Sequence, residues 1–170
     1  MKHLLSIAPL FVAALFAATL PLHAGDNLAP ADKMFAMKAA QGGMMEVRLG
    51  ELAEQKAQSE DVKDFGKMMT TDHSKANAEL TKLAMDKDLK LPATLNKEHM
   101  KSVDKMSKLS GKEFDDAYVA DMVADHRKDV GEFEKASHDL SNPDLKAFAT
   151  KTLPTLKMHL KKIEAIQSKK

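Results

Sequence analysis

The chain has 170 residues, of which 26 are basic, 25 are acidic and none is cysteine. A charge balance this close to zero excludes the basic excess with which proteins bind nucleic acid or anionic lipid. The lack of cysteine excludes disulfide scaffolds, thiolate metal ligands and cysteine nucleophiles. Because Ala, Leu, Met, Lys and Glu abound while aromatic residues are few, we expect an all-α protein held together by packing.

Residues 1–24 have the layout of a secretory signal peptide. A short basic start precedes an almost wholly apolar run over residues 4–22, and Ala24 offers a small residue for cleavage. The run is nearly long enough to span a bilayer, but Pro9 and Pro21 interrupt it, so we favour cleavage over a retained anchor. We therefore expect a periplasmic or secreted protein with no membrane span after cleavage.

Residues 25–170 should form a single helical-bundle domain. Losing the first 24 residues removes Lys2 from the 26 basic residues and none of the 25 acids, which leaves 25 of each. This length suits one domain with one core. The hydrophobic periodicity predicts four long helices in two tight hairpins, with a shorter helix in the connection between the hairpins. The expected helices cover residues 31–56, 59–87, 95–109, 111–138 and 143–167.

Local signals place the helix starts. Ser59 is a good N-cap for the second long helix. Ser110 and Glu113 have the spacing of a capping box just before an apolar run, which predicts the start of the third. Asn142 followed by Pro143 predicts the start of the fourth. These short connections favour antiparallel neighbours, so we expect a four-helix bundle.

Each long helix carries one ligand-type side chain in the middle of an apolar stripe. Residues three or four apart share a helix face, so the stripe marks the side that turns inward. A carboxylate in such a stripe is costly to bury unless something pairs with it. The four residues, one per long helix, are Glu46, His73, His126 and His159.

Counting from the hairpin turns places these four residues at a common level. Glu46 lies 12 residues before the turn at Gln58 and His73 lies 15 after it; His126 lies 15 before the turn at Ser141 and His159 lies 18 after it. At roughly 1.5 Å of rise per residue, hairpin partners differ in height by only about 4.5 Å. The spacing therefore predicts that the four side chains meet in the core.

Three imidazoles and one carboxylate suit a single divalent ion such as zinc, copper or iron. The leading hypothesis is a protein that binds or buffers such a metal, in a role tied to envelope stress. Met69 and Met122, one turn before two of the histidines, raise copper as a soft-ligand alternative, although methionine also fills irregular cores. Asp72 and Asp125, each next to a histidine, are candidates for outer-shell partners or for surface pairing with lysine.

Two other interpretations stay open. The first is a non-catalytic structural or protein-interaction module, in which the same polar residues form a metal-free buried network. The second is an enzyme, but the sequence predicts no catalytic residue. It contains no glycine-rich phosphate loop and no serine in a nucleophile-elbow context.

Several short motifs, in order and spacing, closely resemble a bacterial family known as domain of unknown function 4142, over about residues 31–166. The resemblance implies an exported bundle of ferritin-like type and lends no activity and no site residue. Ferritin-like di-iron proteins use paired Glu-x-x-His motifs. The residues three before the histidines are Thr70, Val123 and Leu156, so the standard di-iron site is absent. The motifs are Ala31-Asp32-Lys33, Gly42-Gly43, Glu46-Val47, Phe65-Gly66-Lys67-Met68-Met69, Asp72-His73, Asp125-His126, Leu153-Pro154-Thr155-Leu156 and His159-Leu160.

Overall fold

The computed structural model of the protein describes residues 28–169. The predicted signal peptide, residues 1–24, lies outside the described residues. Within residues 28–169 the chain forms five helices and no strand. Each helix begins and ends within two residues of its predicted bounds. The helices are α1 (Pro30–Lys56), α2 (Glu60–Met85), α3 (Lys97–Ser107), α4 (Gly111–Asp139) and α5 (Pro143–Gln167).

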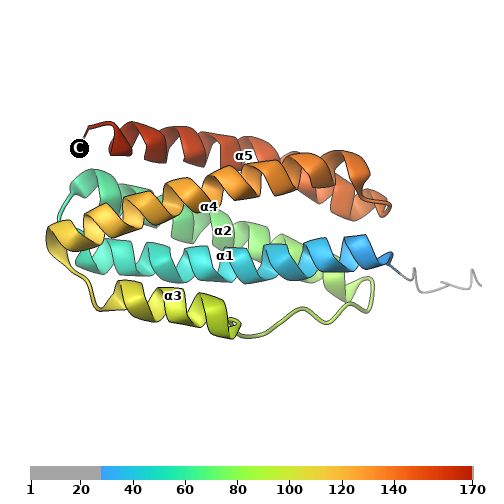
Figure 1. Ribbon diagram of the computed structural model, residues 1–170. Helices are drawn as coiled ribbons and strands as arrows, with labels where there is room; N and C mark the ends of the chain where they lie inside the picture. The colour runs from blue at the N-terminus through green and yellow to red at the C-terminus, as the bar shows by residue number, and fades with distance from the viewer. Residues whose placement is uncertain (1–27, 170) are drawn as a thin grey trace, which may run out of the picture.

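The four long helices form a bundle of two antiparallel hairpins, α1–α2 and α4–α5 (Figure 1). The connection from α2 to α4 runs back along the bundle, and α3 lies on the outside of α1 within it. As a result the two hairpin turns lie at opposite ends of the molecule. One long crossover of this kind is typical of ferritin-like bundles. The predicted fold, an all-α four-helix bundle with an extra short helix between the hairpins, is confirmed.

Two buried carboxylates brace the hairpin turns from the opposite hairpin. Asp115, near the start of α4, accepts hydrogen bonds of 3.1 and 2.9 Å from the backbone amides of residues 58 and 59, at the α1–α2 turn. Asp32, near the start of α1, accepts bonds of 3.0 and 3.2 Å from the amides of residues 141 and 142, at the α4–α5 turn. Hydrogen bonds to a charged acceptor are among the stronger ones, so these two residues help to fix one hairpin on the other.

The helix starts agree with prediction better than the caps do. The Asn142 side chain caps α5, accepting from two backbone amides at 3.1 Å each. Ser59 and Ser110 precede α2 and α4 as expected, but neither side chain makes a capping hydrogen bond. At α2 the carboxylate of Asp115 already takes the amide of Ser59. The predicted Ser110 capping box was therefore wrong as a set of hydrogen bonds, although the helix begins where it indicated.

The core has two apolar halves with a polar layer between them. On α2, Met69 belongs to one apolar cluster and Leu80 to the other, and His73 lies between them. The candidate residues of α4 and α5 lie in the same kind of gap, between the cluster members of their own helix. The polar layer thus crosses the middle of the bundle, where counting from the turns placed it.

Glycines allow the two helices of the first hairpin to approach closely. A Cβ added at Gly50 would lie 2.7 Å from the carbonyl oxygen of Gly66, and one added at Gly66 would lie 2.6 Å from the Cβ of Ala53. A Cβ on Gly43 would lie 2.1 Å from the side-chain oxygen of Asn77. Side chains larger than hydrogen would therefore push α1 and α2 apart at the level of the polar layer and beyond it.

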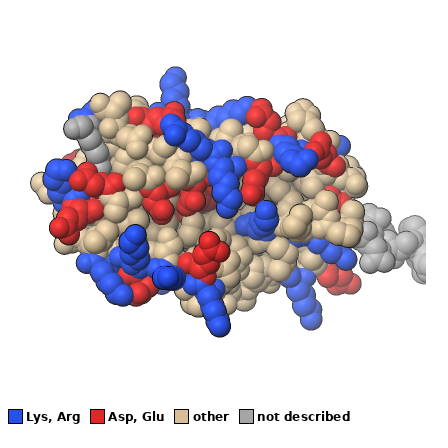
Figure 2. All heavy atoms as spheres, viewed as in Figure 1, with Lys and Arg blue, Asp and Glu red and all other residues tan. Residues whose placement is uncertain are grey.

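The surface mixes charges of both signs. On the face seen in Figure 2, lysine and arginine side chains alternate with aspartate and glutamate, with neither sign gathered into one large patch. Over residues 28–169, no helix combines the length and the apolar character needed to cross a membrane.

Candidate metal centre

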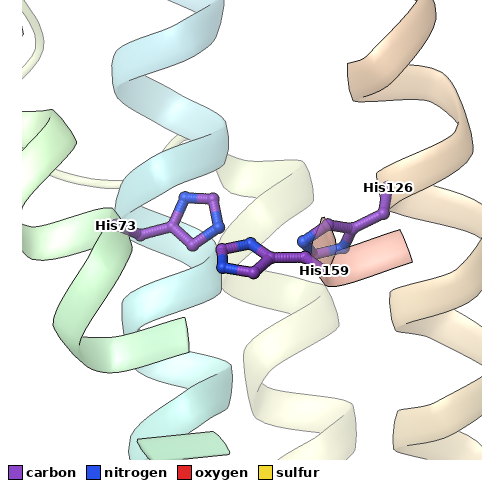
Figure 3. A group of neighbouring side chains, drawn as sticks. All are labelled: His73, His126 and His159. Atoms are coloured by element: carbon purple, nitrogen blue, oxygen red, sulfur yellow. The ribbon is translucent and has the colours of Figure 1, made fainter. Parts of the chain in front are cut away.

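Three histidines from three helices meet inside the bundle. His73 of α2, His126 of α4 and His159 of α5 point their rings toward one another (Figure 3), with ring centroids 5.4 to 5.9 Å apart. One ring nitrogen of each lies within 4.8 Å of one from each of the others. All three side chains are buried. The predicted convergence of these residues is what the structure shows.

One nitrogen of His126 and one of His159 are held by acceptors at the edge of this cluster. His126 Nδ1 lies 3.0 Å from the carbonyl oxygen of Met122. Because a carbonyl can only accept, Nδ1 carries the proton and Nε2 of the neutral ring is left unprotonated. His159 Nε2 lies 2.9 Å from Oδ2 of Asp72, so His159 Nδ1 is the nitrogen left free. Asp72 therefore contacts a histidine of another helix.

Glu46 of α1 lies beside the third ring. Its Oε2 lies 2.9 Å from His73 Nδ1, and its Oε1 lies 3.6 Å from His126 Nε2. The Glu46 side chain is buried, with only 2 % of its surface exposed. The structure thus brings Glu46 to the histidines, as predicted, and directs one of its oxygens to the outer nitrogen of His73.

The remaining ring nitrogens have no hydrogen-bond partner among residues 28–169. They are His73 Nε2, His126 Nε2 and His159 Nδ1, and all three are buried. Glu46 Oε1 is also buried and has no hydrogen-bond partner among these residues. Leaving a buried polar atom unpaired costs about 1–3 kcal/mol, and native proteins leave few of them. Several such atoms in one place make this layer a candidate binding site.

Burial keeps the three imidazoles neutral. Desolvation is the main cause that lowers the pKa of His73, His126 and His159 to about 4. For His126 the neighbouring imidazoles lower it further, against the opposing effect of Glu46. At neutral pH each ring therefore has a lone pair available. Neutral imidazole is the form that binds metal ions.

A second carboxyl group joins Glu46. Asp129 of α4, which is half-buried, lies close enough to Glu46 for each carboxyl group to affect the pKa of the other. Burial raises the pKa of Glu46 to about 7 and, together with the nearby Glu46 carboxylate, that of Asp129 to about 8. Two carboxyl groups in such a place hold a proton that a cation would displace.

The sequence matches the model of the family described as domain of unknown function (DUF4142) over residues 17–166. The chain belongs to the DUF4142 family. Two similar crystal structures are a DUF305 fragment from Deinococcus radiodurans and a predicted secreted DUF305 protein from Streptomyces coelicolor. The first has 12% identity and a TM-score of 0.73, covering 84% of this chain and 99% of that one. The second has 13% identity and a TM-score of 0.69, covering 82% and 93%.

At these identities the likeness to the DUF305 structures concerns the fold alone. No curated protein matches the chain. The resemblance to the DUF4142 family that the motifs indicated is confirmed, and so is the ferritin-like type of the bundle.

The donor set of this DUF4142 protein fits a single metal ion. Zinc bound by imidazole nitrogens at roughly 2.0–2.1 Å in a tetrahedron sets its ligands about 3.4 Å apart. The nitrogens lie within 4.8 Å of one another, so the rings need to close by about an ångström or slightly more. The ring of Phe65 packs edge-on against His126 and His159, with centroids 6.1 and 6.3 Å away. An ion would therefore have an apolar wall on one side and Glu46 on another.

Periodicity did not reveal Asp129 as part of this DUF4142 site. Asp129 lies three residues after His126, a spacing that places two side chains on neighbouring parts of one helix face. The spacing from His126 was the feature of the sequence that could have identified Asp129. Asp72 was considered as an outer partner and takes that position, holding His159. Asp125 instead lies near Lys128 and His99.

Proposed function

We propose that this DUF4142 protein binds one divalent first-row transition-metal ion in the core of its bundle. His73, His126 and His159 supply three nitrogens, and Oε1 of Glu46 is the candidate for the fourth ligand. The observation that carries the proposal is the set of buried ring nitrogens with no partner in residues 28–169. An ion would satisfy all of them at once.

The outer contacts of the rings support a metal site over a metal-free network. In metal sites the second nitrogen of a ligand histidine typically donates to a carboxylate or a backbone carbonyl. Two of the rings have such a partner here, a carbonyl for His126 and a carboxylate for His159. A network built only for packing would be expected to pair its inner nitrogens as well.

Among the candidate ions, zinc fits the site best, with copper and iron as alternatives. Three neutral imidazoles and a carboxylate oxygen form a common zinc ligand set. The thioethers of Met69 and Met122 suggested copper as a possible ion. Both side chains are fully buried members of an apolar cluster, which favours a role in packing the core. In solution the affinity for Cu²⁺ should still exceed that for Zn²⁺, because most nitrogen sites follow that order.

The burial of the site favours storage or buffering of the ion over catalysis. The hollow that touches both Glu46 and His73 is small, with a volume of about 30 Å³. We place this role in the periplasm or outside the cell. The signal-peptide layout of residues 1–24 supports that location, and so does the description of the S. coelicolor neighbour as a predicted secreted protein.

The test is a titration of chelator-treated protein with Zn²⁺, Co²⁺ and Cu²⁺, followed by elemental analysis. We expect close to one ion per chain. His126→Gln should abolish stoichiometric binding, because it removes one of the three nitrogens but keeps a polar side chain. His138→Ala, a change at an exposed histidine of the same helix, is the matched control and should bind like the wild type. Equal binding by His126→Gln would refute the proposal.

A further inference from the structure

A surface hollow between α2 and α5 reaches two of the three histidines. It has a volume of about 130 Å³, and its walls include Asp72, His73, Glu79, Lys151 and His159. It is therefore several times larger than the space beside Glu46. It is the more accessible of the two spaces to an ion that still carries water.

Asp72 links this hollow to the core. Its side chain is 33 % exposed, while the His159 ring to which it is hydrogen-bonded at 2.9 Å is fully buried. One carboxylate thus faces solvent and contacts a candidate ligand at the same time. Carboxylate oxygens bind divalent ions while these still carry water, so Asp72 is suited to be the first protein group that an incoming ion meets.

The seam between α1 and α4 leads to a smaller hollow. That space extends inward from Lys38 and Glu132, past Phe35 and Phe133, to Glu46 and His73. Across its rim Lys38 of α1 pairs with Glu132 of α4 at 3.5 Å. Of the two hollows that reach the histidines, this one offers less space.

We infer that the metal ion enters and leaves between α2 and α5, with Asp72 as its first ligand and His159 as the next. This inference rests on the proposed metal binding and adds the route to it. At Asp72, a carboxylate oxygen takes the place of one water on the ion. The imidazole nitrogens inside then take the place of that oxygen, and the His159 ring moves aside to let the ion pass.

A reversible crosslink tests the route. Because the chain has no cysteine, Glu79→Cys with Lys151→Cys can be joined by a short, reducible, thiol-specific linker across the α2–α5 seam, where the native side chains pair at 2.7 Å. The matched control joins Lys38→Cys and Glu132→Cys across the α1–α4 seam. Zinc uptake and release are followed by stopped flow with a zinc indicator, and the Kd is measured at equilibrium.

We expect the α2–α5 crosslink to slow both uptake and release by roughly tenfold or more with little change in Kd, because it restrains the opening motion. Reduction of the linker should restore the rates, and the α1–α4 crosslink should leave them unchanged. The inference is overturned if the α1–α4 crosslink slows exchange instead, or if neither does. A wild type that binds no zinc would refute the proposed function itself, which is a separate result.

Point variants give a second readout. Lys151 holds Glu79 and adds positive charge at the mouth of the hollow, so Lys151→Gln should raise the association rate roughly two- to fivefold at low salt. Lys38→Gln makes the same change of charge at the other seam and should not. Asp72→Asn should slow association, whereas a role confined to orienting His159 would change dissociation alone.

Discussion

Oε2 of Glu46 lies 2.9 Å from Nδ1 of His73. Both side chains are buried, and they come from the two facing helices of the first hairpin. The two atoms lie at ion-pair distance, and Nε2 of the same ring has no hydrogen-bond partner among the described residues. Glu46 therefore lies beside two of the three imidazoles, where it is the proposed fourth ligand.

Glu46→Gln should weaken zinc binding. The amide keeps the size of the side chain but removes the negative charge from the ion's surroundings, and it is a poorer acceptor for His73. Loss of such a partner typically costs about 10- to 100-fold in metal affinity. A competition titration with a chelator measures the change in Kd. Glu132→Gln, a change at a surface glutamate of the α1–α4 seam, should leave it unaltered.

The same substitution should change how stability depends on pH in the metal-free protein. The pKa of Glu46 is raised from 4.5 to about 7. Its stabilising contribution is therefore complete below pH 4.5 and is lost as the pH rises through 7. Relative to the wild type, Glu46→Gln should gain on the order of 2–3 kcal/mol between pH 4.5 and pH 8. Urea unfolding of both proteins with a chelator present gives this difference, and parallel pH profiles would contradict the expectation.

Zinc should raise the thermal stability of the wild type. A ligand that binds only the folded state at 100 times its Kd adds about 2.7 kcal/mol. For a domain of this size that corresponds to an increase in Tm of about 5–10 °C. Differential scanning calorimetry, with and without the ion, measures it. An equal increase for His126→Gln would show that zinc stabilises the protein at some other place.

Glycine substitutions should separate close helix contact from open space. Gly50→Ala places a Cβ 2.7 Å from the backbone oxygen of Gly66, and we expect a loss of about 1–3 kcal/mol from such overpacking. Gly131 has no atom within 4 Å of its added Cβ among the described residues considered. Gly131→Ala should therefore stabilise the protein by about 0.5–1 kcal/mol through helix propensity. Chemical denaturation distinguishes the two, and equal effects would argue against the close approach.

The brace at the α1–α2 turn should be measurable as stability. Asp115→Ala removes the acceptor of two backbone amides, and we expect a cost of about 1.5–3 kcal/mol. Glu113→Ala changes an exposed acid at the start of the same helix and should cost less than half as much. If the two variants unfold at the same urea concentration, Asp115 does not stabilise the turn.

The level of the site could be predicted because helical geometry is regular. Periodicity gave the inward faces of the long helices, and counting residues from the turns gave the height of His73, His126, His159 and Glu46 along the bundle. The contacts around them could not be predicted in the same way. That Asp72 reaches His159, 87 residues away, depends on how two helices are rotated against each other, which periodicity on a single helix does not fix.

The caps show the same limit. The residues at a helix start suggest local capping, and Asn142 follows that rule. Ser59 does not: its side chain makes no capping hydrogen bond, while Asp115 of another helix accepts from its backbone amide. A tertiary contact of this kind cannot be predicted from the short stretch of sequence that a capping rule examines.

X-ray absorption at the zinc edge of protein loaded with one ion per chain tests the metal centre most directly. Coordination by His73, His126, His159 and Glu46 predicts a four-coordinate ion with three imidazole nitrogens and one oxygen at roughly 2.0–2.1 Å. A first shell made mainly of water oxygens, or one with a single imidazole, would contradict it.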